Sequence, residues 1–167
     1  MMRPSPQDLI ELFQLKPHPE GGYYSEVYRS DEMVPKTALP KRYGGDRAFG
    51  TAIYFLLTQG SRSRLHRLRS DELWHFYLGD PVWVFTIDSK GNVDQVTLGQ
   101  DVFAGHRLFC KVERGLYFGA IPKSGSEFSL VGCTVAPGFA FADFELADRH
   151  KLLAQFPHAR SLIEQLT

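Results

Sequence analysis

The chain has 167 residues, enough for one domain with a substantial core, and we expect a single domain over residues 1–167. Nineteen basic and nineteen acidic residues cancel, so the composition excludes the basic surface typical of nucleic-acid and anionic-membrane binding. The sequence has no signal-peptide pattern and no apolar run of membrane-spanning length. Cys110 and Cys133 lie in apolar, strand-like sequence, which favours buried free thiols over a disulfide. We therefore expect a cytoplasmic protein.

The first predicted element is a short N-terminal helix. Ser5 suits the N-cap and Pro6 the first helical position, and an apolar stripe follows until Pro17. A glycine pair at 21–22 then leads into a strand-like segment. Residues 31–48 are rich in proline and glycine, which predicts a long surface loop.

The central part of the chain predicts short strands separated by turns. Alternating or continuous apolar residues indicate strands at 51–58, 73–78, 82–88, 93–98, 107–112, 116–121, 128–135 and 139–146. Eight or more strands without intervening helices favour a mostly β, antiparallel sandwich or barrel. The tail is helical in period, with Asp148 as its expected N-cap and Pro157 as an interruption.

The segment 60–79 is the most informative stretch. It places His66, Glu72 and His75 within ten residues, and two adjacent antiparallel strands would bring His66 and Glu72 side by side. Such a pair suits proton transfer or metal ligation. The terminal glycines, His66 and Glu72 match four of the five fixed positions in G-x5-H-x-H-x3-E-x6-G, the first motif of the cupin superfamily. The fifth position, normally the second histidine, holds Leu68.

The chain resembles a small family of single-domain cupins sometimes called cupin-5. Matching blocks lie at 18–24 with 28–30, at 70–75, and at 130–139 leading into 143–146. The resemblance implies an antiparallel jelly-roll β-barrel with a short N-terminal helix and C-terminal helices. It also implies a lumen that binds a small molecule and, by analogy, a homodimer.

The second cupin motif, G-x5-P-x-G-x2-H-x3-N, is altered in this chain. With Gly115 as its second glycine, Phe118 stands at the histidine position. His66 and Glu72 alone would remain of the metal-binding set, and two ligands are too few for a tight transition-metal site. We therefore expect no metal and no cofactor. Strand alternation turns His75 away from Glu72, so a surface or interface position is expected for it.

His66 and Glu72 are the candidate catalytic pair. In one interpretation His66 is a general base or acid steered by the carboxylate, and in the other the pair is a structural hydrogen bond. Tyr54 is a weaker candidate for the complementary acid. The ligand-binding candidates are polar or aromatic side chains expected near the lumen: His18, Glu20, Tyr23, Arg29, Trp74, His75, Phe118 and Asp143. Their structural alternatives are turn chemistry, ion pairs and core packing.

Three functions are compatible with these residues. The first is a metal-independent epimerase or isomerase acting on a sugar or nucleotide sugar, similar to the dTDP-4-dehydrorhamnose 3,5-epimerase type. Arg29, Arg47 or Lys123 would meet the pyrophosphate. The alternatives are a non-catalytic small-molecule-binding cupin and a metal-dependent dioxygenase or isomerase that uses His66 and Glu72. The arginines at 62, 64, 67 and 69 favour the solvated face of a strand over a phosphate-binding patch.

Overall fold

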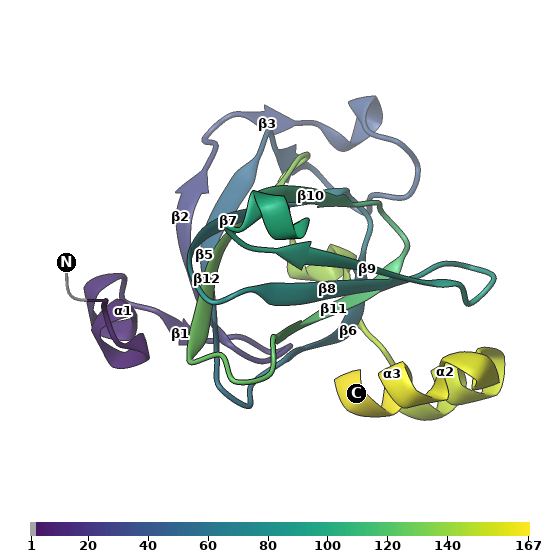
Figure 1. Ribbon diagram of the computed structural model, residues 1–167. Helices are drawn as coiled ribbons and strands as arrows, with labels where there is room; N and C mark the ends of the chain where they lie inside the picture. Colours follow the sequence, from purple (N-terminus) through teal and green to yellow (C-terminus); the bar gives the residue numbers. More distant parts are fainter. Residues whose placement is uncertain (1–2) are drawn as a thin grey trace.

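The computed structural model describes residues 3–167, and two large antiparallel sheets that face each other form the body of the fold (Figure 1). The six-stranded sheet has the order β1 (Lys16–Pro17), β2 (Tyr23–Arg29), β5 (Thr51–Thr58), β12 (Phe128–Val135), β7 (Glu72–Gly79) and β10 (Phe109–Val112). The five-stranded sheet has the order β13 (Phe144–Leu146), β6 (Ser63–Leu68), β11 (Tyr117–Pro122), β8 (Val82–Ile87) and β9 (Val93–Leu98). The predicted mostly β jelly roll is confirmed.

Helices lie outside the two sheets. The N-terminal helix α1 (Pro6–Leu12) sits beside β1, and α2 (Arg149–Gln155) and α3 (Arg160–Leu166) lie together near β6 and β11 (Figure 1). Single 3₁₀ turns make up the remainder: η1 (Lys36–Ala38), η2 (Val102–Ala104), η3 (Phe141–Asp143) and η4 (Pro157–Ala159). No helix within residues 3–167 combines the length and apolarity needed to cross a membrane.

Local capping explains where the helices begin. The Ser5 hydroxyl accepts the backbone N–H of Asp8, and the Asp8 carboxylate accepts the backbone N–H of Ser5, which is a reciprocal capping box. The Asp148 carboxylate accepts the backbone N–H of Lys151 at the start of α2. Both predicted helix starts are therefore confirmed.

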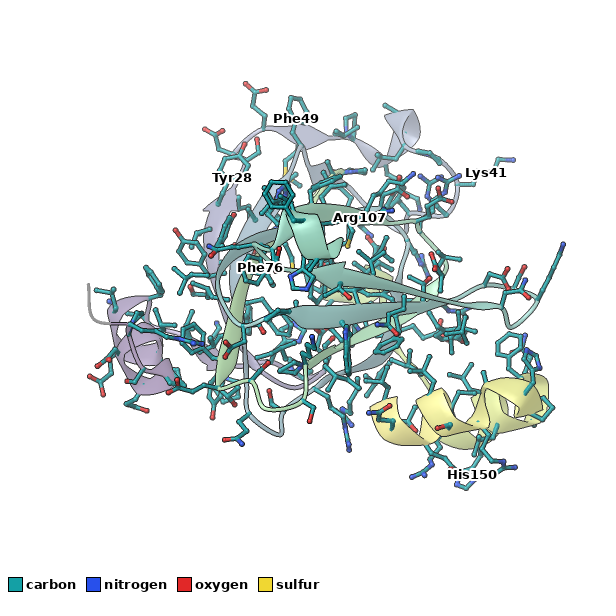
Figure 2. All side chains as sticks on the ribbon, viewed as in Figure 1. Tyr28, Lys41, Phe49, Phe76, Arg107 and His150 are labelled. Atoms are coloured by element: carbon teal, nitrogen blue, oxygen red, sulfur yellow. The ribbon has the colours of Figure 1, made fainter. Side chains whose placement is uncertain are left out.

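The core has three parts because some strands are covered on both faces. In β5, Phe55 and Leu57 pack between the sheets, whereas Leu56 packs outward against the α1 side. Leu65 of β6 packs outward against the C-terminal helices. The side chain of His150 on α2 points away from the sheets (Figure 2). Both cysteines are buried and free, as predicted.

Three predictions about the elements are wrong. Residues 31–48 are not one loop, because a short ladder joins β3 (Met33–Val34) to β4 (Arg47–Ala48). The predicted strand 139–146 is a strand only over its last three residues, after η3. The strands that carry His66 and Glu72 are not neighbours: after a bend at residues 69–71 the chain crosses from β6 in one sheet to β7 in the other.

Candidate active site

A cavity of about 210 Å³ occupies the lumen between the sheets. His66 reaches it from β6 and Glu72 from β7, so these two side chains approach it from opposite sheets. Exposed lining residues, Lys16 among them, mark the opening to solvent. The remaining lining is largely apolar and aromatic: Tyr24, Ile53, Phe55, Leu68, Val135, Phe139, Phe141 and Phe144.

Glu20 is the hub of the polar cluster in this cavity. Its Oε1 accepts the Ser63 hydroxyl at 2.7 Å, and its Oε2 lies 3.2 Å from Nε2 of His66. The same Oε2 lies 3.5 Å from Nδ1 of His18. All four side chains come from two distant segments, the 18–22 turn and β6, which the fold places together.

The hydrogen bonds define the tautomer of each imidazole. Nδ1 of His66 lies 2.7 Å from the Arg64 carbonyl oxygen, which only accepts, so Nδ1 carries the hydrogen and Nε2 has the free lone pair. Nδ1 of His18 accepts the backbone N–H of Glu20 at 3.2 Å, so its neutral ring carries hydrogen on Nε2. Nε2 of His66 therefore needs a donor, and the facing group is the Glu20 carboxyl.

Burial supplies that donor by keeping the carboxyls protonated. Desolvation raises the pKa of Glu20 from 4.5 to about 8, although the Ser63 hydrogen bond and the Arg64 charge act in the opposite direction. Desolvation is also the main cause that lowers the pKa of His66, and it lowers the pKa of His18 to about 4. At neutral pH the contact between Glu20 and His66 is thus a neutral hydrogen bond in which the carboxyl donates, and not an ion pair.

Glu72 is the second buried carboxyl of the cavity. Desolvation raises its pKa from 4.5 to about 7, against the opposing influence of His66. Its Oε2 has no hydrogen-bond partner within residues 3–167, and neither has the indole N–H of Trp74. Buried polar atoms are seldom left unpaired, so Oε2 of Glu72, which lines the cavity, is available to a polar group of a ligand or to water. A carboxyl pKa raised toward neutrality suits proton exchange.

Aromatic rings enclose the imidazoles. The ring of Phe118 lies 4.0 Å and that of Phe144 lies 5.2 Å, centroid to centroid, from the ring of His66. Tyr24 contacts His18 edge-on at 4.6 Å. Such walls exclude water around the polar cluster and suit the apolar face of a flat or cyclic ligand.

Several predicted residues lie at the cavity. His18, Glu20, Arg29, His66 and Glu72 line it. Two others, Trp74 and Phe118, are fully buried and pack behind it. Arg29 also makes an ion pair, the structural alternative to ligand binding, and donates to both carboxylate oxygens of Glu26 at 2.7 and 2.9 Å.

Four predicted residues do not lie at the cavity. Tyr54 and Tyr23 face outward and pack with the α1 side of the sheet, because they alternate with the lumen-facing Phe55 and Tyr24. His75 also faces outward, beside Phe109 and Thr134. Asp143 is buried in an ion pair with Arg47. Other lining residues were missed, such as Phe139 and Phe144, and no local sequence pattern separates them from ordinary core residues.

Family and structural comparisons agree with this architecture. The Cupin_5 family model, described as Cupin superfamily (DUF985), matches residues 7–147. The chain belongs to the Cupin_5 family. No curated protein matches it.

Two solved structures resemble this cupin over almost its full length. Protein SO0799 from Shewanella oneidensis is 36% identical with a TM-score of 0.89, and the match covers 99% of this chain and 98% of that chain. A hypothetical protein from Leishmania major is 36% identical with a TM-score of 0.88, covering 98% and 99%. Oxalate decarboxylase from Bacillus subtilis shares the fold alone, at 16% identity and a TM-score of 0.56, over 90% of this chain and 36% of that chain.

The donor set of this lumen does not fit a tight transition-metal site. Oxalate decarboxylase has Mn(II) centres, but the two cupin positions that would add histidines hold Leu68 and Phe118 here. Both side chains are apolar and buried, and the lone pair of His66 faces Glu20. Within residues 3–167 no three His, Cys, Asp or Glu side chains are arranged to hold a metal. The polar cluster is therefore better suited to moving protons than to ligation.

Proposed function

We propose that this cupin is a metal-independent epimerase or isomerase that acts on a sugar or nucleotide sugar held in the lumen. The observation that carries the proposal is the convergence of two protonated or half-protonated carboxyls and two neutral imidazoles on one enclosed cavity. Moving a proton at a carbon next to a carbonyl requires a base on one side and an acid on the other. The cluster contains both kinds of group.

We assign the base role to Glu72 and the acid role to the hydrogen-bonded pair of Glu20 and His66. The lone pair of His66 is already engaged by Glu20, whereas Oε2 of Glu72 has no partner within residues 3–167. Glu72 and His66 also approach the cavity from opposite sheets, so a bound ring would meet them on different sides. This assignment replaces the roles expected from the sequence, where His66 was a candidate base or acid and Tyr54 a weaker candidate for the complementary acid.

The size of the lumen limits the substrate. Pockets for drug-sized ligands usually measure about 300–1,000 Å³. The lumen measures about 210 Å³, which is close to the needs of a single sugar ring. Any nucleotide would therefore remain toward the opening, where the side chain of Lys16 offers positive charge.

Solvent deuterium exchange tests the proposal whichever product is formed. The protein is incubated in D₂O with nucleotide-linked 4-keto sugars and simple keto sugars, and the recovered sugar is analysed by mass spectrometry. Glu72→Gln should slow deuterium uptake by about 10²–10⁴-fold, and His66→Asn should have a comparable effect. His75→Asn is the matched control, because it alters an imidazole on the outer face of the strand that carries Glu72. If the Glu72→Gln variant takes up deuterium as fast as the wild-type protein, Glu72 is not the base.

One observation favours a second function, a binding module without turnover. The hydrogen-bond network around Glu20 is largely satisfied by protein groups alone, as in a rigid structural network. Calorimetry with the same sugars separates the two functions. Saturable binding to the wild-type protein without deuterium uptake supports the binding module.

A further inference from the structure

A second hollow, of about 600 Å³, adjoins the lumen cavity. Leu68 and Phe144 belong to the walls of both. Unlike the largely apolar lumen, this hollow has a basic wall with four arginines: Arg42, Arg67, Arg69 and Arg114. The chain as a whole is electrically balanced, so this concentration of guanidinium groups is local.

The fold holds two of these arginines in place through each other's backbone. Nε of Arg42 donates to the carbonyl oxygen of Arg69 at 2.9 Å, and Nη1 of Arg69 donates to the carbonyl oxygen of Arg42 at 2.6 Å. The guanidinium of Arg42 also stacks over the ring of Tyr43 at 4.8 Å. These contacts restrict the side chains before any ligand arrives, which lowers the entropic cost of binding.

The carboxylates of the hollow are already paired. Asp143 accepts two 2.6 Å hydrogen bonds from Arg47, and Glu145 accepts a fork of hydrogen bonds from Arg67. Arg69 Nε is 3.9 Å from Asp143, beyond hydrogen-bond distance.

Arg114 is also beyond hydrogen-bond distance of its nearest carboxylate, because its Nη1 is 3.8 Å from Asp71. Arg42 has no carboxylate partner within residues 3–167. Three guanidinium groups at one hollow, those of Arg42, Arg69 and Arg114, therefore retain donors for an anion.

We propose that this hollow binds the diphosphate group of a small phosphorylated molecule, at a site separate from the lumen. A guanidinium matches a phosphate through two parallel hydrogen bonds, and three guanidinium groups exceed what one small anion requires. Leu68, Ala142 and Phe144 add an apolar part to the wall, where the organic part of the ligand would lie. The site goes beyond the proposed sugar chemistry and does not depend on it.

Titration calorimetry with inorganic pyrophosphate, free of divalent cations and at low ionic strength, tests the proposal. We expect saturable one-to-one binding that weakens as sodium chloride is added. Arg69→Gln and Arg114→Gln should each weaken it by on the order of tenfold, because each removes charge-assisted hydrogen bonds. Arg62→Gln is the matched control: it removes the same charge from an exposed residue just before β6 that does not line this hollow.

Each alternative result overturns the proposal in a distinct way. No saturable heat at millimolar pyrophosphate means that the hollow is not a diphosphate site. An equal loss in Arg62→Gln means general electrostatic attraction. Loss of binding in Lys16→Gln, with Arg69→Gln unaffected, places the pyrophosphate at the lumen opening. Failure of the deuterium exchange experiment leaves this measurement unchanged, so the two proposals are tested separately.

Discussion

The buried carboxyls of the lumen make the stability of the fold depend on pH above neutrality. The pKa of Glu20 rises from 4.5 in the unfolded chain to about 8 in the fold, and that of Glu72 rises to about 7. A group with a raised folded pKa favours the fold while it is protonated and loses that contribution as pH rises through the folded pKa. The carboxyls alone would lower the free energy of unfolding from about pH 4.5 upward, but the two imidazoles, whose folded pKa values are lowered, act in the opposite sense up to about pH 6.5. The net fall therefore lies between about pH 6.5 and pH 8.5.

The magnitude follows from the two pKa values. One pKa unit corresponds to about 1.4 kcal/mol, so over this window ionisation of Glu20 should cost about 2 kcal/mol and that of Glu72 about 1 kcal/mol. The two imidazoles change the free energy of unfolding in the opposite sense. The pKa of His18 falls to about 4 and that of His66 is also lowered, so the fold gains stability while the unfolded chain loses its last imidazolium protons. Their offset is smaller than the loss from the carboxyls, because it ends just above pH 7. The net loss is about 2 kcal/mol.

Urea denaturation at closely spaced pH values measures this loss directly. Glu20→Gln keeps a donor toward His66 and an acceptor for Ser63, so it should preserve the fold at about pH 6.5 and remove most of the pH dependence. Glu72→Gln should remove a smaller part. A wild-type protein with constant stability over this pH window, or a Glu20→Gln variant with the full loss, would refute the assignment of a protonated Glu20.

Further predictions concern positions outside the polar cluster, each measured by urea denaturation at pH 7. Asp143→Asn leaves Arg47 buried without its carboxylate, and we expect a loss of about 3–5 kcal/mol. Glu145→Gln removes the exposed ion pair with Arg67 and should lower the free energy of unfolding by less than about 1 kcal/mol. A loss equal to that of Asp143→Asn would contradict the role of burial. Gly79→Ala should cost about 2 kcal/mol or more, because Gly79 has a φ of +102° and an added Cβ would lie 2.5 Å from the Phe128 carbonyl oxygen.

Local chemistry made part of this fold predictable. The helix starts at Ser5 and Asp148 depend on residues three positions away, and β5 and β12 have the predicted bounds. The bend between β6 and β7 was misassigned because a few polar residues between strands do not show whether the chain turns back or crosses to the other sheet. His66 and Glu72 therefore share a cavity from opposite sheets instead of lying on neighbouring strands.

The face of a strand that lines a cavity was harder to predict where both faces are buried. Both faces of β5 are covered: Phe55 points into the lumen and Tyr54 packs toward α1. The apolar run in β5 is therefore continuous. Alternation then carries no information, and the prediction for Tyr54 is wrong. In β7 the outer face is partly exposed, so the pattern correctly separated Trp74 from His75.

The partnership of Glu20 and His66 shows how a backbone requirement can build a polar site. Gly21 has a φ of +111°, and an added Cβ would lie 2.1 Å from the Arg62 carbonyl oxygen, so only glycine permits the turn to pack this closely on the start of β6. That close approach sets Glu20 beside Ser63 and His66. The glycine pair after Glu20 was the available sequence feature. A glycine pair permits a close backbone approach, but the partner cannot be read from it because the approaching strand is distant in the chain.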